Sequence, residues 1–208
     1  MSSEQPAAIL IADASGLDFL NSIATPVDTP VDWMGTGEKF LDWLAQAKLV
    51  APATAATLRR EAQPGELDSV AAEARKLREW FRAFVREHKG RPLTGKDLKA
   101  LEPLNRLLER DEIFHRIVAT GQKQSPTFEL ETTRRWRSPE SLLLPIAAAL
   151  AKLVCEEDFT YVKACEGPTC TLMFADHTRG RARRWCSMAI CGNRAKQIAH
   201  RSRAKAQR

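Results

Sequence analysis

The sequence lacks a long hydrophobic run. Its longest apolar stretch, residues 142–151, has ten residues, about half of the roughly 20 that a membrane-spanning helix needs. The N-terminus has no basic stretch followed by an apolar one, so we expect no signal peptide and a cytoplasmic location. The sequence shows no Gly-rich phosphate loop and no recognisable Ser/His/Asp arrangement. These absences favour a protein that is neither membrane-bound nor an enzyme.

Cysteine is also scarce, but four of the five cysteines gather near the C-terminus. Their spacing is C-x4-C-x15-C-x4-C, and the residues are Cys165, Cys170, Cys186 and Cys191. Thiols stay reduced in the cytoplasm, so two such pairs favour one Zn²⁺ ion over disulfides or four merely buried thiols. Four sulfur ligands leave no open position, so the zinc would be structural. His177 could in principle replace one cysteine, but four thiolates already complete the shell.

Charge divides the chain unevenly. Residues 165–208 contain ten Lys and Arg against two acidic residues, a net of +8. The other 164 residues have 22 basic and 24 acidic side chains, a net of −2. A slightly acidic region followed by a basic C-terminal module favours a polyanionic partner for the module, with DNA the first candidate.

The residues after the last cysteine predict a basic helix. The segment 192–208 has no Pro, and its small and apolar residues fall on one narrow face at helical spacing. Its Arg and Lys side chains suit phosphates, and Asn or Gln can pair with adenine. A solvated terminal helix without a partner would show the same pattern. The candidate nucleic-acid contacts are Arg179, Arg181, Arg183, Arg184, Asn193, Arg194, Lys196, Gln197, His200, Arg201, Arg203 and Lys205.

The first 160 residues predict a mainly helical α+β domain with a small antiparallel sheet. We expect a strand over 7–12, a long helix over 67–88, and a helix from 138 to about 156. Pro145 within that helix would either end its first turn or bend it. The runs 113–120 and 127–133 predict a β-hairpin with one wet face. Residues 161–208 predict a knuckle, a hairpin and a helix, the layout of a treble-clef-like zinc finger with four cysteine ligands.

Two polar residues near the start of the chain are candidates for a ligand pocket. Asp18 and Asn21 could line a small-molecule site in the N-terminal domain. Turn and capping chemistry suits the same residues better, because Asp and Asn favour such positions intrinsically.

The finger residues resemble those of a known family. Cys165-x4-Cys170, Phe174-x-Asp176 and the segments 184–188 and 191–196 are similar to the CGNR zinc-finger family of bacterial proteins. Thr178 departs from that pattern, in which Ser is usual, but keeps the hydroxyl. Segments 17–21 and 40–44 resemble the ABATE domain that precedes this finger. The resemblance implies an α+β domain over 1–160, a zinc-bound finger over 161–208, and a stress-induced transcription regulator.

The leading hypothesis is therefore a cytoplasmic bacterial DNA-binding regulator. Its N-terminal domain would sense a small-molecule effector or form a homodimer. An RNA-binding module is a second hypothesis, because the same charges suit either backbone. An enzyme with its pocket in the N-terminal domain, and the zinc as a structural clip, is a third.

Overall fold

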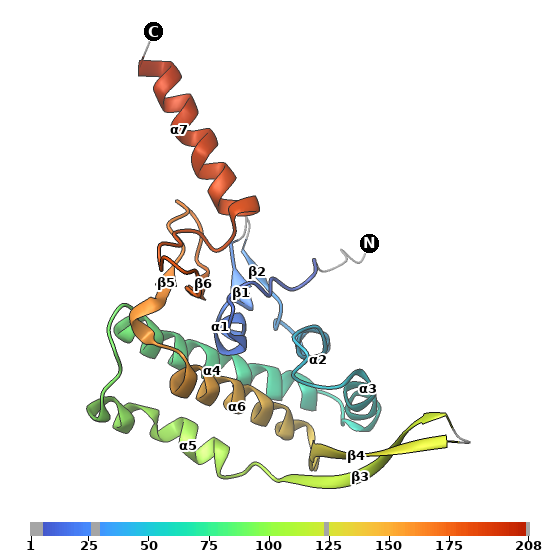
Figure 1. Cartoon of the computed structure of the whole chain (residues 1–208). Helices are drawn as coiled ribbons and strands as arrows, with labels where there is room; N and C mark the ends of the chain where they lie inside the picture. The colour runs from blue at the N-terminus through green and yellow to red at the C-terminus, as the bar shows by residue number, and fades with distance from the viewer. Residues whose placement is uncertain (1–5, 26–29, 123–124, 207–208) are drawn as a thin grey trace.

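The computed structural model describes residues 6–25, 30–122 and 125–206, and the side chains within them except those of 122, 125, 199, 200 and 202–206. We call residues 6–160 the body and residues 161–206 the finger. Figure 1 shows the body as a group of helices below, the finger above it, and the last helix projecting away from both.

Helices dominate the body. The longest, α4 (Glu66–His88), buries Leu67, Val70, Ala74 and Phe81, at intervals of three, four and seven residues that keep them on one face. Short helix α1 (Ser15–Leu20) packs against both α4 and α6 (Leu143–Glu156). Helix α2 (Gly37–Gln46) contacts α4 and α3 (Pro52–Glu61), and α5 (Glu102–Leu108) contacts α6. The predicted helix over 67–88 is confirmed.

Pro and capping residues set the helix boundaries. Thr94 and Asp97 form a capping box at the start of the 3₁₀ helix η1 (Gly95–Leu101), and Pro103 stands in the first turn of α5. Of the two possibilities for Pro145, the structure fits a break near it: the 3₁₀ turn η2 (Pro139–Leu142) precedes α6, and Pro145 falls in the first turn of α6. N–H groups in a first turn have no helical partner, so proline loses nothing there.

The N-terminal strand is a wrong prediction. Within the described residues, 6–12 form no strand, although the Ala175 amide donates one hydrogen bond to the Ala12 carbonyl at 2.9 Å. The strands nearby are two-residue segments, β1 (Ile23–Ala24) and β2 (Val31–Asp32), which pair antiparallel. An apolar run becomes a strand only when a neighbouring strand satisfies its backbone, and the run itself cannot show whether one is present.

The predicted hairpin is present, but both of its faces are exposed to solvent instead of one. Strands β3 (Ile113–Gln122) and β4 (Ser125–Arg134) pair antiparallel, with Ile117 opposite Leu130. The prediction of one wet face is wrong, because large apolar side chains on the other face are exposed too. Figure 1 shows why: the outer part of the hairpin extends beyond the helices.

The finger joins the body through a shared core. The 3₁₀ turn η3 (Phe159–Tyr161) leads into β5 (Val162–Ala164), which pairs antiparallel with β6 (Met173–Ala175). A π-helical turn η4 (Met188–Gly192) then runs directly into α7 (Asn193–Ala206). All three residues of β6 are buried in the same apolar cluster as α1 and α4. The fold is therefore α+β, with a helical body, small antiparallel sheets and a C-terminal four-cysteine finger.

No helix among the described residues has both the length and the apolar content needed to cross a membrane.

Candidate metal centre and nucleic-acid surface

Four sulfur atoms converge in the finger. The Sγ atoms of Cys165, Cys170, Cys186 and Cys191 all lie within 4.8 Å of one another. The Sγ–Sγ distance is 3.8 Å from Cys170 to Cys186 and 3.6 Å from Cys186 to Cys191. A tetrahedral zinc site with Zn–S bonds of about 2.3 Å places its sulfurs about 3.8 Å apart. The four cysteines can therefore hold one zinc ion, and a complete sulfur shell makes that ion structural.

The turn between the first two cysteines is built for close approach. The Gly167 amide donates to Cys165 Sγ at 3.4 Å, and the Cys186 amide donates to the same sulfur at 3.2 Å. A Cβ at Gly167 would lie 3.0 Å from the Cys170 Cβ and 3.1 Å from the Cys191 Sγ. Glycine is needed here because the turn passes against two of the ligands.

The pKa values of the cysteine thiols favour the binding of a cation. A hydrogen bond from the Cys186 thiol lowers the pKa of Cys170 to about 5, and the same bond raises the pKa of Cys186. Burial raises the pKa of Cys191 to about 12. The Cys170 thiol can therefore ionise readily, whereas the thiolates of Cys186 and Cys191 need a positive charge beside them. A bound dication supplies that charge, which couples metal binding to proton release and to folding.

A buried aspartate organises the loop between the cysteine pairs. Asp176 is fully buried and accepts hydrogen bonds from Lys163 Nζ at 2.7 Å, Thr178 Oγ1 at 2.6 Å and the Arg183 amide at 2.9 Å. Burial alone would raise its pKa, but the bonds from Lys163 and Thr178 outweigh burial and hold the pKa well below its usual range. Thr178, the departure from the family pattern, thus makes its contact through the hydroxyl. His177 lies outside the sulfur cluster and contacts Glu157.

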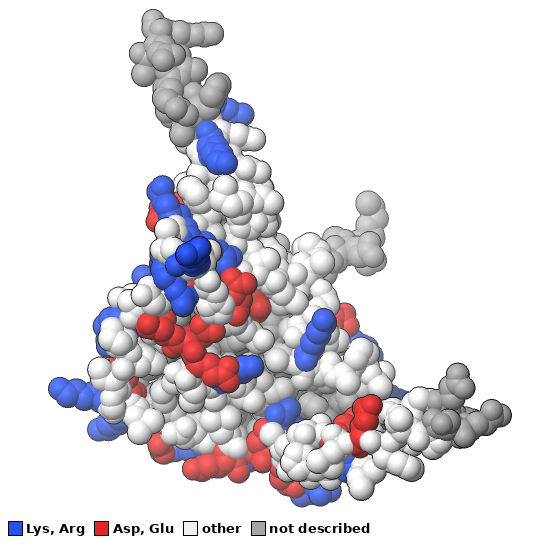
Figure 2. Space-filling view, in the orientation of Figure 1, with Lys and Arg blue, Asp and Glu red and all other residues white. Residues whose placement is uncertain are grey.

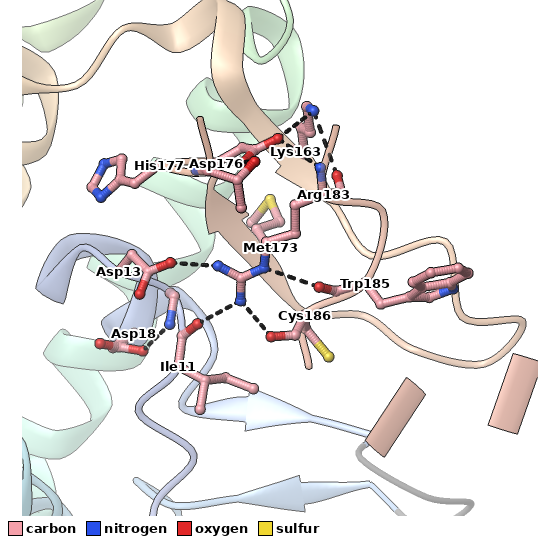
Figure 3. A network of polar contacts seen from close by, with 12 residues as sticks. Ile11, Asp13, Asp18, Lys163, Met173, Asp176, His177, Arg183, Trp185 and Cys186 are labelled. Carbon is pink, nitrogen blue, oxygen red and sulfur yellow. Dashed lines mark hydrogen bonds and ion pairs between the residues drawn. The ribbon is translucent and has the colours of Figure 1, made fainter. Parts of the chain in front are cut away.

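Arg183 fastens the finger to the start of the body. Its guanidinium donates to the Trp185 carbonyl at 3.0 Å and the Ile11 carbonyl at 3.1 Å, and also to the Cys186 carbonyl and the Asp13 carboxylate. Figure 3 shows these partners around one side chain. The guanidinium also lies 4.2 Å from the Phe174 ring. These contacts leave Arg183 little capacity for a phosphate, so the structure gives this predicted nucleic-acid contact an internal role.

Asn21 also joins body and finger. Its Nδ2 donates to the Met173 carbonyl at 2.8 Å, and the Met173 amide donates to its Oδ1 at 3.0 Å. The residue is 2% exposed. Asp18 accepts a hydrogen bond from the Ala12 amide at 3.0 Å, and burial raises its pKa to about 6. The polar atoms of Asn21, and one carboxylate oxygen of Asp18, are thus used within the fold.

The other predicted nucleic-acid residues lie in the loop between the cysteine pairs and in helix α7. Figure 2 shows Lys and Arg gathered over the finger, with acidic side chains over the neighbouring body. Arg181 lies 4.5 Å from the Tyr161 ring, and both Nε and Nη2 of Arg184 contact Glu166 at 2.6 Å. Arg194, at the start of α7, is half-buried. Arg181 and Arg184 are exposed, as are the candidates Arg179, Asn193, Lys196, Gln197 and Arg201. The side chains of His200, Arg203 and Lys205 lie outside the described ones.

Sequence reasoning missed the contacts that organise the finger loop and those that join the finger to the body. Lys163 carried no motif, and the bond from Asn21 to Met173 spans 152 positions. A pairing at that separation leaves no local spacing signal. Only the family pattern around Asp176 pointed to one member of this network.

The fold and the sulfur cluster define a two-part chain: an α+β body followed by a four-cysteine zinc finger. Residues 13–157 match the ABATE family, whose description is "putative stress-induced transcription regulator". Residues 161–204 match the CGNR zinc finger. The chain therefore belongs to the ABATE family, as its sequence resemblance indicated. Neither family is described as an enzyme. A search of curated proteins finds no match to this chain.

Proposed function

We propose that this protein is a zinc-dependent transcription regulator whose C-terminal helix contacts DNA. The observation that carries the proposal is the position of Cys191. This ligand lies in the turn η4, which continues without a break into α7. A zinc ion held by Cys191 therefore fixes the start and direction of the helix that follows. The metal acts as a scaffold, and the residues after it make the contacts.

One face of α7 carries suitable side chains. Asn193, Lys196, Gln197 and Arg201 are exposed and follow one another at spacings of three, one and four. These intervals place them along one side of a helix. This arrangement suits DNA, where Lys and Arg side chains bind phosphates and the amides of Asn and Gln pair with base edges. A helix of 14 residues is about 21 Å long and fits a major groove about 12 Å wide.

Salt dependence tests the proposal. If about four cations neutralise phosphates, log affinity should fall against log salt with a slope of about −3.6. Lys196→Ala with Arg201→Ala should make that slope shallower by about 1.8. The matched control is Lys76→Ala with Arg106→Ala, which removes one Lys and one Arg, each 74% exposed, from the body. Equal losses in both variants, or no salt-sensitive binding, would refute the proposal.

Competition separates the two nucleic acids. The zinc-loaded protein bound to labelled duplex DNA is challenged with unlabelled duplex DNA or structured RNA at fixed salt. Preferential displacement by DNA supports the proposal. Preferential displacement by RNA would instead favour the RNA-binding hypothesis, because the two duplexes differ in groove shape and in the 2′-hydroxyl.

A groove between body and finger is the proposed effector site. It has a volume of about 770 Å³ and is lined by Leu10 and Ile11 from the body and by Trp185 and Met188 from the finger. Ligand sites commonly have this size and occur where two domains meet. Met188 begins the turn into α7, so a ligand here would contact the base of the proposed DNA-binding helix. A thermal-shift screen should find ligands that stabilise the wild type but not Trp185→Ala.

A further inference from the structure

Three large apolar side chains lie almost uncovered on one face of the β3–β4 hairpin. Ile117 is 75% exposed, Phe128 is 72% exposed and Leu130 is 70% exposed. Ile117 is paired with Leu130, and Phe128 with Ala119. Alternate residues of a strand share a face, so these four side chains form one patch. Ile113, at 54% exposure, extends it toward the base of the hairpin.

This apolar face is also free of formal charge along most of its length. From Ile113 to Ala119, and from Phe128 to Arg134, this face carries two titratable residues. His115 contacts Thr132 at 3.0 Å, and Arg134, opposite Ile113, is 13% exposed and paired with Asp111. The opposite face of the same segment carries Arg116, Glu129 and Glu131. In a two-fold dimer, charged residues that lie near the axis face their own copies, so like charges meet there. A neutral apolar face meets its copy without that repulsion, whereas a polyanion would gain little from it.

The exposed area suits a weak dimer. The side chains of Ile113, Ile117, Phe128 and Leu130 together expose on the order of 500 Å² in each chain, a size that usually marks an interaction site. Two copies together would bury about 1,000 Å², the lower end of specific interfaces. An isolated two-stranded hairpin is at best marginally stable in water, so a second sheet against its apolar face would also stabilise it.

We propose that two copies of this chain form a homodimer by packing these hairpin faces against each other about a two-fold axis. The two sheets would lie about 10 Å apart, with the apolar side chains interdigitated between them. The contact uses body residues alone and does not depend on nucleic-acid binding.

Sedimentation and light scattering of the zinc-loaded full chain test the proposal. The wild type should reach twice its mass of 23.3 kDa at high micromolar concentration. Ile117→Lys with Leu130→Glu should weaken dimerisation at least about 100-fold, because four buried apolar side chains are lost from each dimer. This change places opposite charges in one cross-strand pair, which supports the hairpin and leaves the net charge unchanged.

The matched control reverses a pair on the other face. Arg116→Glu with Glu131→Arg exchanges the charges of a pair whose atoms lie 2.6 Å apart and should leave dimerisation unchanged. Ile117→Thr with Leu130→Thr should weaken the dimer as the charged pair does, since Thr suits strands. Unchanged circular dichroism and melting temperature confirm that each variant folds. A wild type that stays monomeric, or apolar-face variants that dimerise like the wild type, would overturn the proposal. Gel shifts on the same variants test DNA binding separately.

Discussion

Asn21 offers the sharpest test of how finger and body are joined. Its amide exchanges two hydrogen bonds, of 2.8 and 3.0 Å, with the backbone of Met173. Asn21→Ala would leave the Met173 amide and carbonyl buried without partners. Each such group costs about 1–3 kcal/mol, so we expect the free energy of unfolding to fall by about 2–6 kcal/mol. That is a large part of the roughly 5–15 kcal/mol available to a domain.

Urea denaturation of the zinc-loaded protein, followed by tryptophan fluorescence, measures this loss. The matched control is Asn193→Ala, an exposed asparagine whose change should stay within about 0.5 kcal/mol. A loss below that limit for Asn21→Ala would refute the assignment. Asn21→Asp adds a signature that lost packing alone does not produce. The new carboxylate would be buried and would face the Met173 carbonyl oxygen. Both effects disfavour its charged form, so the pKa of the aspartate should rise above its unfolded value. Stability should therefore fall as pH rises through the folded pKa and recover on acidification.

Three further variants test the metal centre and the raised pKa of Asp18. Metal analysis should find one zinc ion per chain in the wild type and in Cys155→Ser, whereas Cys170→Ser should lose it, because one ligand is gone. Gly167→Ala should speed zinc loss to a chelator, since its Cβ would crowd two ligands, and Gly180→Ala, with open space around it, should not. Asp18→Asn should raise stability above pH 6 by up to about 3 kcal/mol and change little at pH 4. The sign follows because burial raises the folded pKa to about 6 from 3.8, so the wild type loses stability as pH rises between these values. A stability difference that is independent of pH would contradict this account.

The elements predicted correctly are those that local chemistry specifies. The apolar spacing of α4 and the antiparallel pairing of β3 with β4 each involve residues that lie close together along the chain. The cysteine pairs act similarly, because each pair lies in one tight turn and only their convergence requires the fold. Prediction from sequence worked wherever the interacting groups were close along the chain.

The features that the sequence did not reveal have the opposite cause. Residues 7–12 have the composition of a strand but form none in the part of the chain that the structure describes, and of them Ala12 alone accepts a backbone hydrogen bond from β6. The β3–β4 hairpin has the correct alternation, but alternation cannot show whether another element covers the apolar face. Arg183 belongs to a basic cluster in the sequence, yet its partners Ile11 and Asp13 lie about 170 positions away. Each of these outcomes depends on a contact between distant segments.

These distant contacts change what the zinc ion is expected to hold in place. A small finger folded by its metal alone could move freely at the end of a chain. Here Asn21 is hydrogen-bonded to β6, and Arg183 is hydrogen-bonded to Ile11 and Asp13. The apolar core also continues from α1 into the finger. The zinc ligand Cys191 adds the last link, from the finger to α7. Helix α7 is therefore tied to the body through two polar bridges and one metal centre. Movement of the body's first residues, such as ligand binding in the groove beside Trp185 would cause, could then redirect the helix.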